Sequence, residues 1–416
     1  MGDSSRQRAD RRRAARIVAL CLAVSTASAF TAAQVGIANA VPDAPGAVRP
    51  PRVSTPRLAP LPESQWTDVH KAVVTKYGVN GRVGNAPATL LHIPALAEAF
   101  LSFPAYLTRD SSLTPRHRSL LILRTAWLLN SDVLWAEQVP AARAAGITAA
   151  DVRRVADGPD ARGWSPFDAT LLRLADQLFR NSFVNDAVYN ALTAEYDVHH
   201  TMDAVMTVAD FITLGLMYNA LGVQPDTASA DRIPADVPYL VVVPRREAPL
   251  TTPRIEPVAG PGLGITRTFA RHPALAAARK ELGYINQQAK LDPRYRELVI
   301  LRTGWNTRSE YEWAQHVGSF GRGREMGLPI DDIARGPEAP GWTPFERALL
   351  TAADELYRDS SVSDRTWAAL AMQLDTPGIV NALISAAQYR QVAIALNAFG
   401  VQLEPGDERF PAPGAN

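Results

Sequence analysis

LDPRYRELVILRTGW, which occupies residues 291–305, nearly repeats LTPRHRSLLILRTAW at residues 113–127. Apolar residues of the later copy recur at three- and four-residue spacing, as on one face of an α-helix: Tyr295, Leu298, Leu301 and Trp305. Asp292 and Pro293 come directly before this pattern and are typical of a helix N-cap and a first-turn proline. The stretch therefore predicts a helix that the chain contains twice.

Two further pairs of segments show that the repeat extends well beyond this helix. GWSPF at residues 163–167 matches GWTPF at 341–345, and NALGVQ at 219–224 matches NAFGVQ at 397–402. All three pairs are separated by the same 178 residues, so we infer a tandem duplication. Strand signals are nearly absent. The sequence predicts an all-α protein with two similar helical domains.

Composition excludes several classes of function. The chain has 416 residues, 47% of them hydrophobic, and a formal net charge of +1, which gives no electrostatic footprint for nucleic acid. Cys21 is its only cysteine and lies within a predicted export signal. The mature protein would have no thiol, so its chemistry would use carboxylates, imidazole, hydroxyls and arginine.

The N-terminal residues resemble an export signal. Arg11, Arg12, Arg13 and Arg16 precede an uncharged stretch at residues 17–40, which ends in the small-x-small sequence Ala-Asn-Ala. An uncleaved membrane anchor is the alternative, because the stretch is long enough to span a bilayer. We expect the protein to be secreted or held in the cell envelope, with membrane contact only if the signal is not cleaved.

Proline-rich stretches separate the repeated regions and set the domain boundaries that we predict. These are a signal peptide at 1–40, a linker at 41–63, a first domain at 64–224, a linker at 225–257, a second domain at 258–404 and a C-terminal tail at 405–416. The apolar helix near residues 205–220 carries Asp210 and Asn219, which favours a buried or subunit-contact helix over a membrane span.

The duplication allows structural residues to be separated from candidate reactive ones. Residues that the shared fold requires should be present in both copies, whereas residues that a reaction requires can be present in one. Three titratable residues occur only in the second copy, with counterparts in the first as follows: Glu297 (Ser119), Glu312 (Leu134) and His316 (Gln138). The second copy is therefore predicted to hold the working site, and the first to be a degenerate structural partner.

The spacing of these residues brings them together. Ser309 can cap a helix that starts near Glu310, and Glu312 and His316 then lie four residues apart on one face. Glu297 would reach them from the preceding helix. A carboxylate beside an imidazole suits proton transfer. Two alternatives remain: Ser309 and Glu312 can form a capping box, and His316 can be a hydrogen-bonded core histidine. A metal site fits less well, because only one imidazole is present.

The second copy resembles the carboxymuconolactone decarboxylase family. The resemblance rests on RELVILRTGW at 296–305, SEYEWAQH at 309–316 and a Gly-Leu-Pro helix start at Gly327, and it extends over residues 272–402. The first copy is similar, less faithfully, over residues 92–224. Related AhpD-like proteins place a Cys-x-x-Cys pair where this chain has Ser309 and Glu312, so thiol-dependent peroxide reduction is excluded.

The resemblance implies an all-helical homo-oligomer, such as a trimer, that works without a cofactor. The expected activity is that of an exported carboxy-lyase, which decarboxylates a small carboxylated lactone or related organic acid. His316 would donate the proton, Glu297 would orient the His316 ring and Glu312 would complete the proton relay. The candidates for substrate binding are Arg302, Arg294, Tyr311 and Trp313. Because Arg302 has a counterpart in the first copy, an ion-pair or packing role is its alternative. A proton-transfer isomerase or cyclase, and a non-catalytic secreted binding or scaffold protein, are the alternative functions.

Overall fold

The computed structural model describes residues 48–226, 231–244, 246, 248–318 and 320–411. The predicted signal at residues 1–40 lies outside these ranges. Throughout the described residues the regular elements are helices, so the all-α prediction is confirmed. The described residues from 48 to 410 belong to one compact body.

Ten helices make up the first unit, the part of the body before residue 225. They are the 3-10 helix η1 (Glu63–Gln65) and the α-helices α2 (Asp68–Tyr77), α3 (Asn85–Leu90), α4 (Pro94–Arg109), α5 (Pro115–Leu128), α6 (Asp132–Ala144), α7 (Ala149–Asp157), α8 (Pro166–Asn181), α9 (Asp186–Thr193) and α10 (Val198–Leu221).

The second unit, after residue 257, repeats the order of α3 to α10, except that two helices stand at the position of the single helix α4. Its helices are α11 (Gly264–Phe269), α12 (Pro273–Ala278), α13 (Glu281–Gln287), α14 (Pro293–Asn306), α15 (Glu310–Val317), α16 (Ile330–Arg335), α17 (Pro344–Asp359), α18 (Asp364–Ala371) and α19 (Thr376–Phe399). Four pairs have identical lengths at the 178-residue offset: α5 and α14, α8 and α17, α9 and α18, α10 and α19. The predicted duplication is therefore present in the fold.

The ends of α14 follow from its sequence. The Asp292 side chain accepts a hydrogen bond from the Arg294 backbone amide at 2.8 Å, and Pro293 occupies the first helical position. The predicted N-cap is confirmed. After the helix, Arg308 takes the left-handed conformation with φ of 53°, which turns the chain back toward α15.

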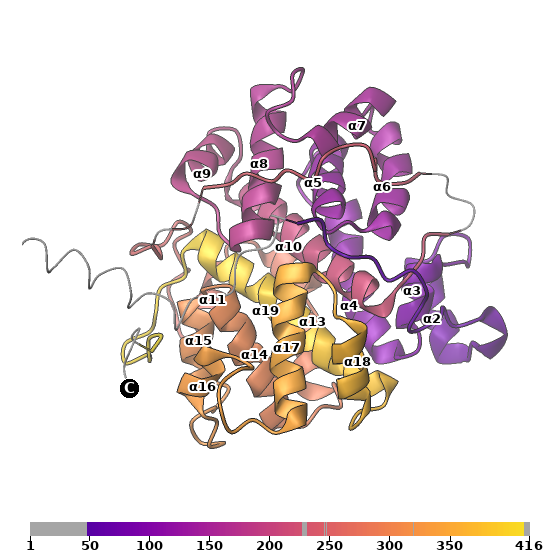
Figure 1. Cartoon of the computed structure of the whole chain (residues 1–416). Coiled ribbons are helices and arrows are strands. Elements are labelled where there is room, and N and C mark those ends of the chain that lie inside the picture. Colours follow the sequence, from indigo (N-terminus) through magenta and orange to yellow (C-terminus); the bar gives the residue numbers. More distant parts are fainter. Residues whose placement is uncertain (1–47, 227–230, 245, 247, 319, 412–416) are drawn as a thin grey trace, which may run out of the picture. The chain divides into compact units, whose positions relative to one another are not determined.

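Two 24-residue helices, α10 and α19, form the centre of the body and pack directly against each other (Figure 1). By length and composition α10 is the one helix among the described residues that could cross a membrane, but 94% of its apolar window is buried within the body. Asp210 lies at 1% exposure inside this core. The prediction of a buried helix is confirmed.

Both proline-rich linkers pack against the helices. The Arg57 amide bonds to the Leu221 carbonyl, and the Arg254 amide bonds to the Phe399 carbonyl, each at 2.9 Å. The Arg57 guanidinium pairs with an aspartate of α18, and that of Arg254 with an aspartate of α9. Each linker is therefore tied by its backbone to the unit that it leads into and by its arginine side chain to the other unit.

Candidate active site

A carboxylate and an imidazole meet between neighbouring helices of the second unit. Glu297 lies on α14 and His316 on α15, and Oε2 of the glutamate is 2.6 Å from Nδ1 of the imidazole. Both side chains are about 3% exposed. Arg296 Nε lies 3.6 Å from the other carboxylate oxygen. A short bond of this kind between buried groups fixes the orientation of the ring.

The second ring nitrogen of His316 is left available for chemistry. Because Nδ1 is occupied by Glu297, Nε2 is the free ring nitrogen, and it has no hydrogen-bond partner among the described residues. The ring is held edge-on by Tyr389 and Phe320, with centroid distances of 4.8 and 5.3 Å. The packing therefore restrains the ring without using its second nitrogen.

Glu312 lies one turn before His316 on α15, and it is a buried acid without a partner. Glu312 is only 2% exposed, and neither of its carboxyl oxygens is hydrogen-bonded within the described structure. Burial, and then the charge of Glu297, raise the pKa of Glu312 well above its ordinary value. Both effects favour the neutral carboxyl over the carboxylate, and the neutral carboxyl can donate a hydrogen bond.

The capping-box interpretation of Glu312 is wrong. Ser309 does occupy the N-cap position of α15, but its side chain makes no capping hydrogen bond. Its hydroxyl oxygen is also buried and has no hydrogen-bond partner in the described part of the chain. Since the reciprocal bond that defines a capping box is missing, helix capping does not account for the position of Glu312.

A small pocket of about 70 Å³ opens onto these groups. Glu312 and His316 line it from α15, Asn286 from α13, and Tyr389 and Val392 from α19. Most of its other walls are leucine, isoleucine and aromatic side chains, and no lysine or arginine lines it within the described residues. Glu297 does not line the pocket, and it binds Nδ1 of His316 from outside the pocket.

Tyr389 and Asn286 are lining residues that the sequence interpretation missed. Burial, followed by the charges of Glu297 and Glu312, raises the pKa of the Tyr389 phenol. The counterpart of Tyr389 at the 178-residue offset is Phe211. This loss of a hydroxyl in the first copy was the signal that could have identified it, since it parallels the differences at Glu297 and His316.

Gly321 allows the backbone to approach the Glu297–His316 pair. A Cβ atom at Gly321 would lie 2.3 Å from Oε2 of the glutamate and 2.6 Å from Nδ1 of the imidazole. Any larger residue would have to displace one member of the pair, so glycine is required here for close packing.

The first unit holds a neutral pair at the equivalent position. Gln138 Nε2 donates to Ser119 Oγ at 3.0 Å, and both side chains are buried. Leu134 replaces the buried acid Glu312. The same scaffold therefore carries hydrogen-bonded but non-titrating groups in the first unit, and acid–base groups in the second.

Arg302, a predicted substrate ligand, has a structural position instead. Its guanidinium forms two hydrogen bonds to Asp354, at 2.6 and 2.9 Å, and donates to two backbone carbonyls in α16. Arg124 makes the same arrangement with Asp176 in the first unit. Because these donors are occupied and Arg302 does not line the pocket, its assignment to substrate binding is withdrawn.

The three other predicted substrate ligands differ in position. Arg294 lies outside the pocket, where it donates to the Met326 carbonyl and pairs with Glu346. Trp313 is fully buried and packs against other aromatic rings, again outside the pocket. Tyr311 does line the pocket. Burial raises its pKa to about 12, so its hydroxyl is protonated at neutral pH.

Replacing Glu312 with glutamine should make stability less dependent on pH. The raised pKa means that the folded state holds a proton that the unfolded state releases above its ordinary pKa of 4.5, so stability is lost as pH rises. Glutamine is neutral throughout. We expect the variant to gain up to about 1.4 kcal/mol relative to the parent for each pH unit above that value, until the folded-state pKa is reached.

Urea unfolding of both proteins between pH 5 and pH 8 measures this difference. A gap that widens with pH supports the protonated state of Glu312. A gap that stays constant would show that the folded protein holds Glu312 as an ionised carboxylate.

Fold and site together define a class: an all-helical protein of two tandem units, of which the second has a buried glutamate–histidine pair behind a pocket. Residues 94–177 and 273–355 both match the Carboxymuconolactone decarboxylase family, so the chain contains two tandem units of that family. The second match includes Glu297, Glu312 and His316. Neither the curated proteins nor the solved structures gave a significant match.

Proposed function

We propose that the second unit is a cofactor-free decarboxylase, which acts on a small carboxylated lactone or related organic acid by acid–base catalysis. The observation that carries the proposal is the 2.6 Å bond between Glu297 and His316, with the imidazole lining a pocket that it shares with Glu312, whose pKa is raised by burial. A positioned imidazole with a supporting carboxylate is suited to deliver a proton to carbon.

In the proposed reaction, the bond between the substrate carbon and its carboxylate breaks and releases CO2. The electron pair moves into a conjugated carbonyl and gives a dienolate. Glu312 would donate a hydrogen bond to the oxygen on which this charge develops. His316 would enter this step as an imidazolium, with one proton on Nδ1 toward Glu297 and the other on Nε2, and would transfer the Nε2 proton to the dienolate carbon. The ring is left neutral with its proton on Nδ1, and solvent would return a proton to Nε2 before the next turnover.

The apolar walls of the pocket would assist the loss of CO2. A carboxylate is poorly solvated there, whereas the dienolate spreads the same charge over more atoms. Removing water would also strengthen the hydrogen bond from Glu312.

A second function on the same groups is proton transfer without loss of CO2, as in an isomerase or cyclase. The feature that favours it is the absence of lysine and arginine from the pocket lining within the described residues. A neutral lactone would need no cationic partner in this pocket.

The two reactions can be separated by running a panel of carboxylated lactones, β-keto acids and neutral lactones in D2O. Headspace CO2 and deuterium in the product are measured together. Deuterium with an equal amount of CO2 supports the decarboxylase, and deuterium without CO2 supports the isomerase. If neither is found with any substrate, the catalytic proposal fails and the binding-protein alternative replaces it.

Two further parts of the proposal concern where and in what form the protein acts. The signal predicted at residues 1–40 would place it outside the cytoplasm, and resemblance to the family favours a homo-oligomer such as a trimer. Both can be checked on protein recovered from the source culture, by N-terminal sequencing and by its mass in solution.

A further inference from the structure

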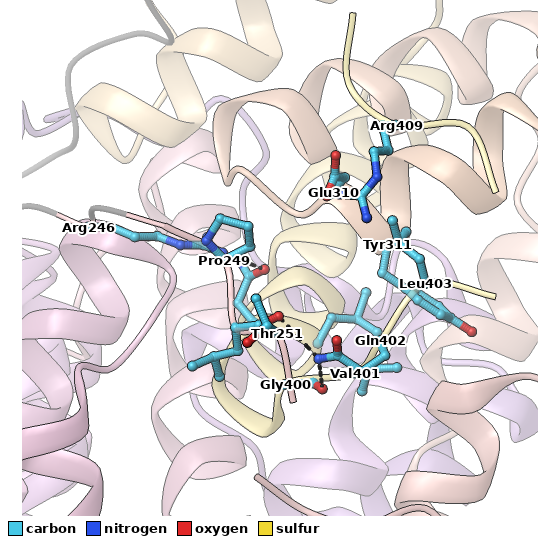
Figure 2. Close-up of a pocket in the computed structure, with 13 residues that line it drawn as sticks. Arg246, Pro249, Thr251, Glu310, Tyr311, Gly400, Val401, Gln402, Leu403 and Arg409 are labelled. Atoms are coloured by element: carbon cyan, nitrogen blue, oxygen red, sulfur yellow. Dashed lines mark hydrogen bonds and ion pairs between the residues drawn. The ribbon is translucent and has the colours of Figure 1, made fainter. Parts of the chain in front are cut away.

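A second and larger cavity lies beside the candidate active site. It has a volume of about 260 Å³, close to the lower end of pockets that bind small molecules, about 300 Å³. Residues 249–251 of the second linker, the start of α15 and residues 400–403 form its walls (Figure 2). Tyr311 and Leu396 line both this cavity and the active-site pocket, so the two are neighbours.

Unlike the active-site pocket, this cavity is lined by two guanidinium groups. Arg246 reaches it from the linker, and Arg409 from the C-terminal segment (Figure 2). Among the described residues that line it, Glu310 is the one acid, and it pairs with Arg409 at 3.0 Å. Among the described side chains of the lining, one positive charge is therefore left without a balancing carboxylate.

Arg246 is the less satisfied of the two arginines. It is 8% exposed, and Nη1 donates to the carbonyls of Thr307 and Arg308. Nη2 makes only a 3.5 Å contact with Asn397, and Arg246 has no carboxylate partner within the described residues. Burial, and then the nearby charge of Arg308, lower the pKa of Arg246 to about 10. An anion in the cavity would offset the free-energy cost of burying the Arg246 charge and its repulsion by Arg308.

In the first unit, the arginine that corresponds to Arg246 has a side-chain hydrogen-bond acceptor. The linker sequences STPRL (54–58) and TTPRI (251–255) align, which places Arg49 opposite Arg246. Arg49 donates to the side chain of Asn130 and to a backbone carbonyl. The residue of the second unit that corresponds to Asn130 is Arg308. An acceptor has thus been replaced by a second cation.

Backbone conformation does not explain why Arg308 stands where the first unit has Asn130. Asn130 and Arg308 both have φ of 53°, in the left-handed region. Asparagine tolerates this conformation better than arginine does, so local backbone preference does not explain the arginine. A positive charge beside Arg246 has a direct electrostatic use if an anion binds there.

We propose that this cavity is a binding site for a small organic monocarboxylate, with Arg246 and Arg409 as its charged ligands. The planar fork of a guanidinium matches the two oxygens of a carboxylate. The single uncompensated charge fits a monoanion. This site is separate from the Glu297–His316 pair, and it goes beyond the proposed function because it requires no turnover.

Isothermal titration with benzoate, and with benzamide as its neutral analogue of similar shape, tests the proposal on the full chain. We expect benzoate to bind and benzamide to bind at least tenfold more weakly. Arg246→Met and Arg409→Met should each weaken benzoate binding about tenfold or more. His316→Gln should leave it unchanged, because the imidazole does not line this cavity.

Arg308→Asn is the matched variant, because it restores the acceptor found in the first unit. It should weaken benzoate binding while preserving the fold, since asparagine accepts the left-handed backbone. This keeps the proposal testable if Arg246→Met fails to fold. Equal binding of benzamide, undiminished binding by Arg308→Asn and Arg409→Met, or loss of binding in His316→Gln would each overturn it.

Discussion

Replacing His316 with glutamine is expected to abolish turnover while leaving the fold intact. The first unit already holds Gln138 at the equivalent position, buried and hydrogen-bonded to Ser119. Glutamine therefore fits the scaffold, but its amide cannot carry a proton at neutral pH. Loss of a positioned general acid lowers rates by about 10²- to 10⁴-fold. Product formation in D2O and the thermal unfolding midpoint measure the two effects.

The double variant Glu297→Ser/His316→Gln serves as the control for folding. It reproduces the complete pair of the first unit, so it should unfold at a temperature close to that of the parent and be inactive. Full turnover by His316→Gln would refute the catalytic assignment. Loss of folding in both variants would instead show that the pair supports the structure of the second unit.

Replacing Arg302 with methionine is expected to destabilise the protein by about 3–5 kcal/mol, because it leaves a buried carboxylate without its charged partner. Asp354 would retain only the hydrogen bond from Asn306, at 2.8 Å. Methionine keeps much of the length of the side chain, so loss of the ion pair is the main effect. Urea unfolding measures the loss.

Arg124→Met is the matched variant in the first unit, where the guanidinium has the same partners. The structural role predicts a similar loss of stability for both variants. A protein in which Arg302→Met folds normally and only raises KM would restore Arg302 as a substrate ligand.

Much of the fold could be predicted because its signals are local or repeated. The N-cap at Asp292 and the 178-residue offset are visible in the printed sequence. The linker contacts were not predicted, because Arg57 and Arg254 bind partners on the opposite unit that no local pattern specifies. The break between α12 and α13 was also missed. It occurs at Arg279, whose buried guanidinium stacks on Phe269 at 4.0 Å.

Prediction of the site succeeded where the duplication supplied a comparison. Glu297 and His316 were identified because the first copy lacks both, and the structure brings them into contact. Arg302 was a candidate for substrate binding because of its charge, with an ion pair as the alternative because it occurs in both copies, and the structure gives it the ion pair. Tyr389 was missed although the duplication offered the comparison with Phe211, because it joins the pocket from a helix 73 residues beyond His316 and has no motif of its own.

The orientation of the His316 ring is the central claim, and nitrogen-15 NMR of the imidazoles tests it without a substrate. The chain has seven histidines, so comparison with His316→Gln assigns the signal. We predict a slowly exchanging proton on Nδ1 of His316 that shifts in Glu297→Gln, as expected for a buried bond to the carboxylate. A His316 ring whose only proton is on Nε2, and which is unaffected by Glu297→Gln, would contradict the account.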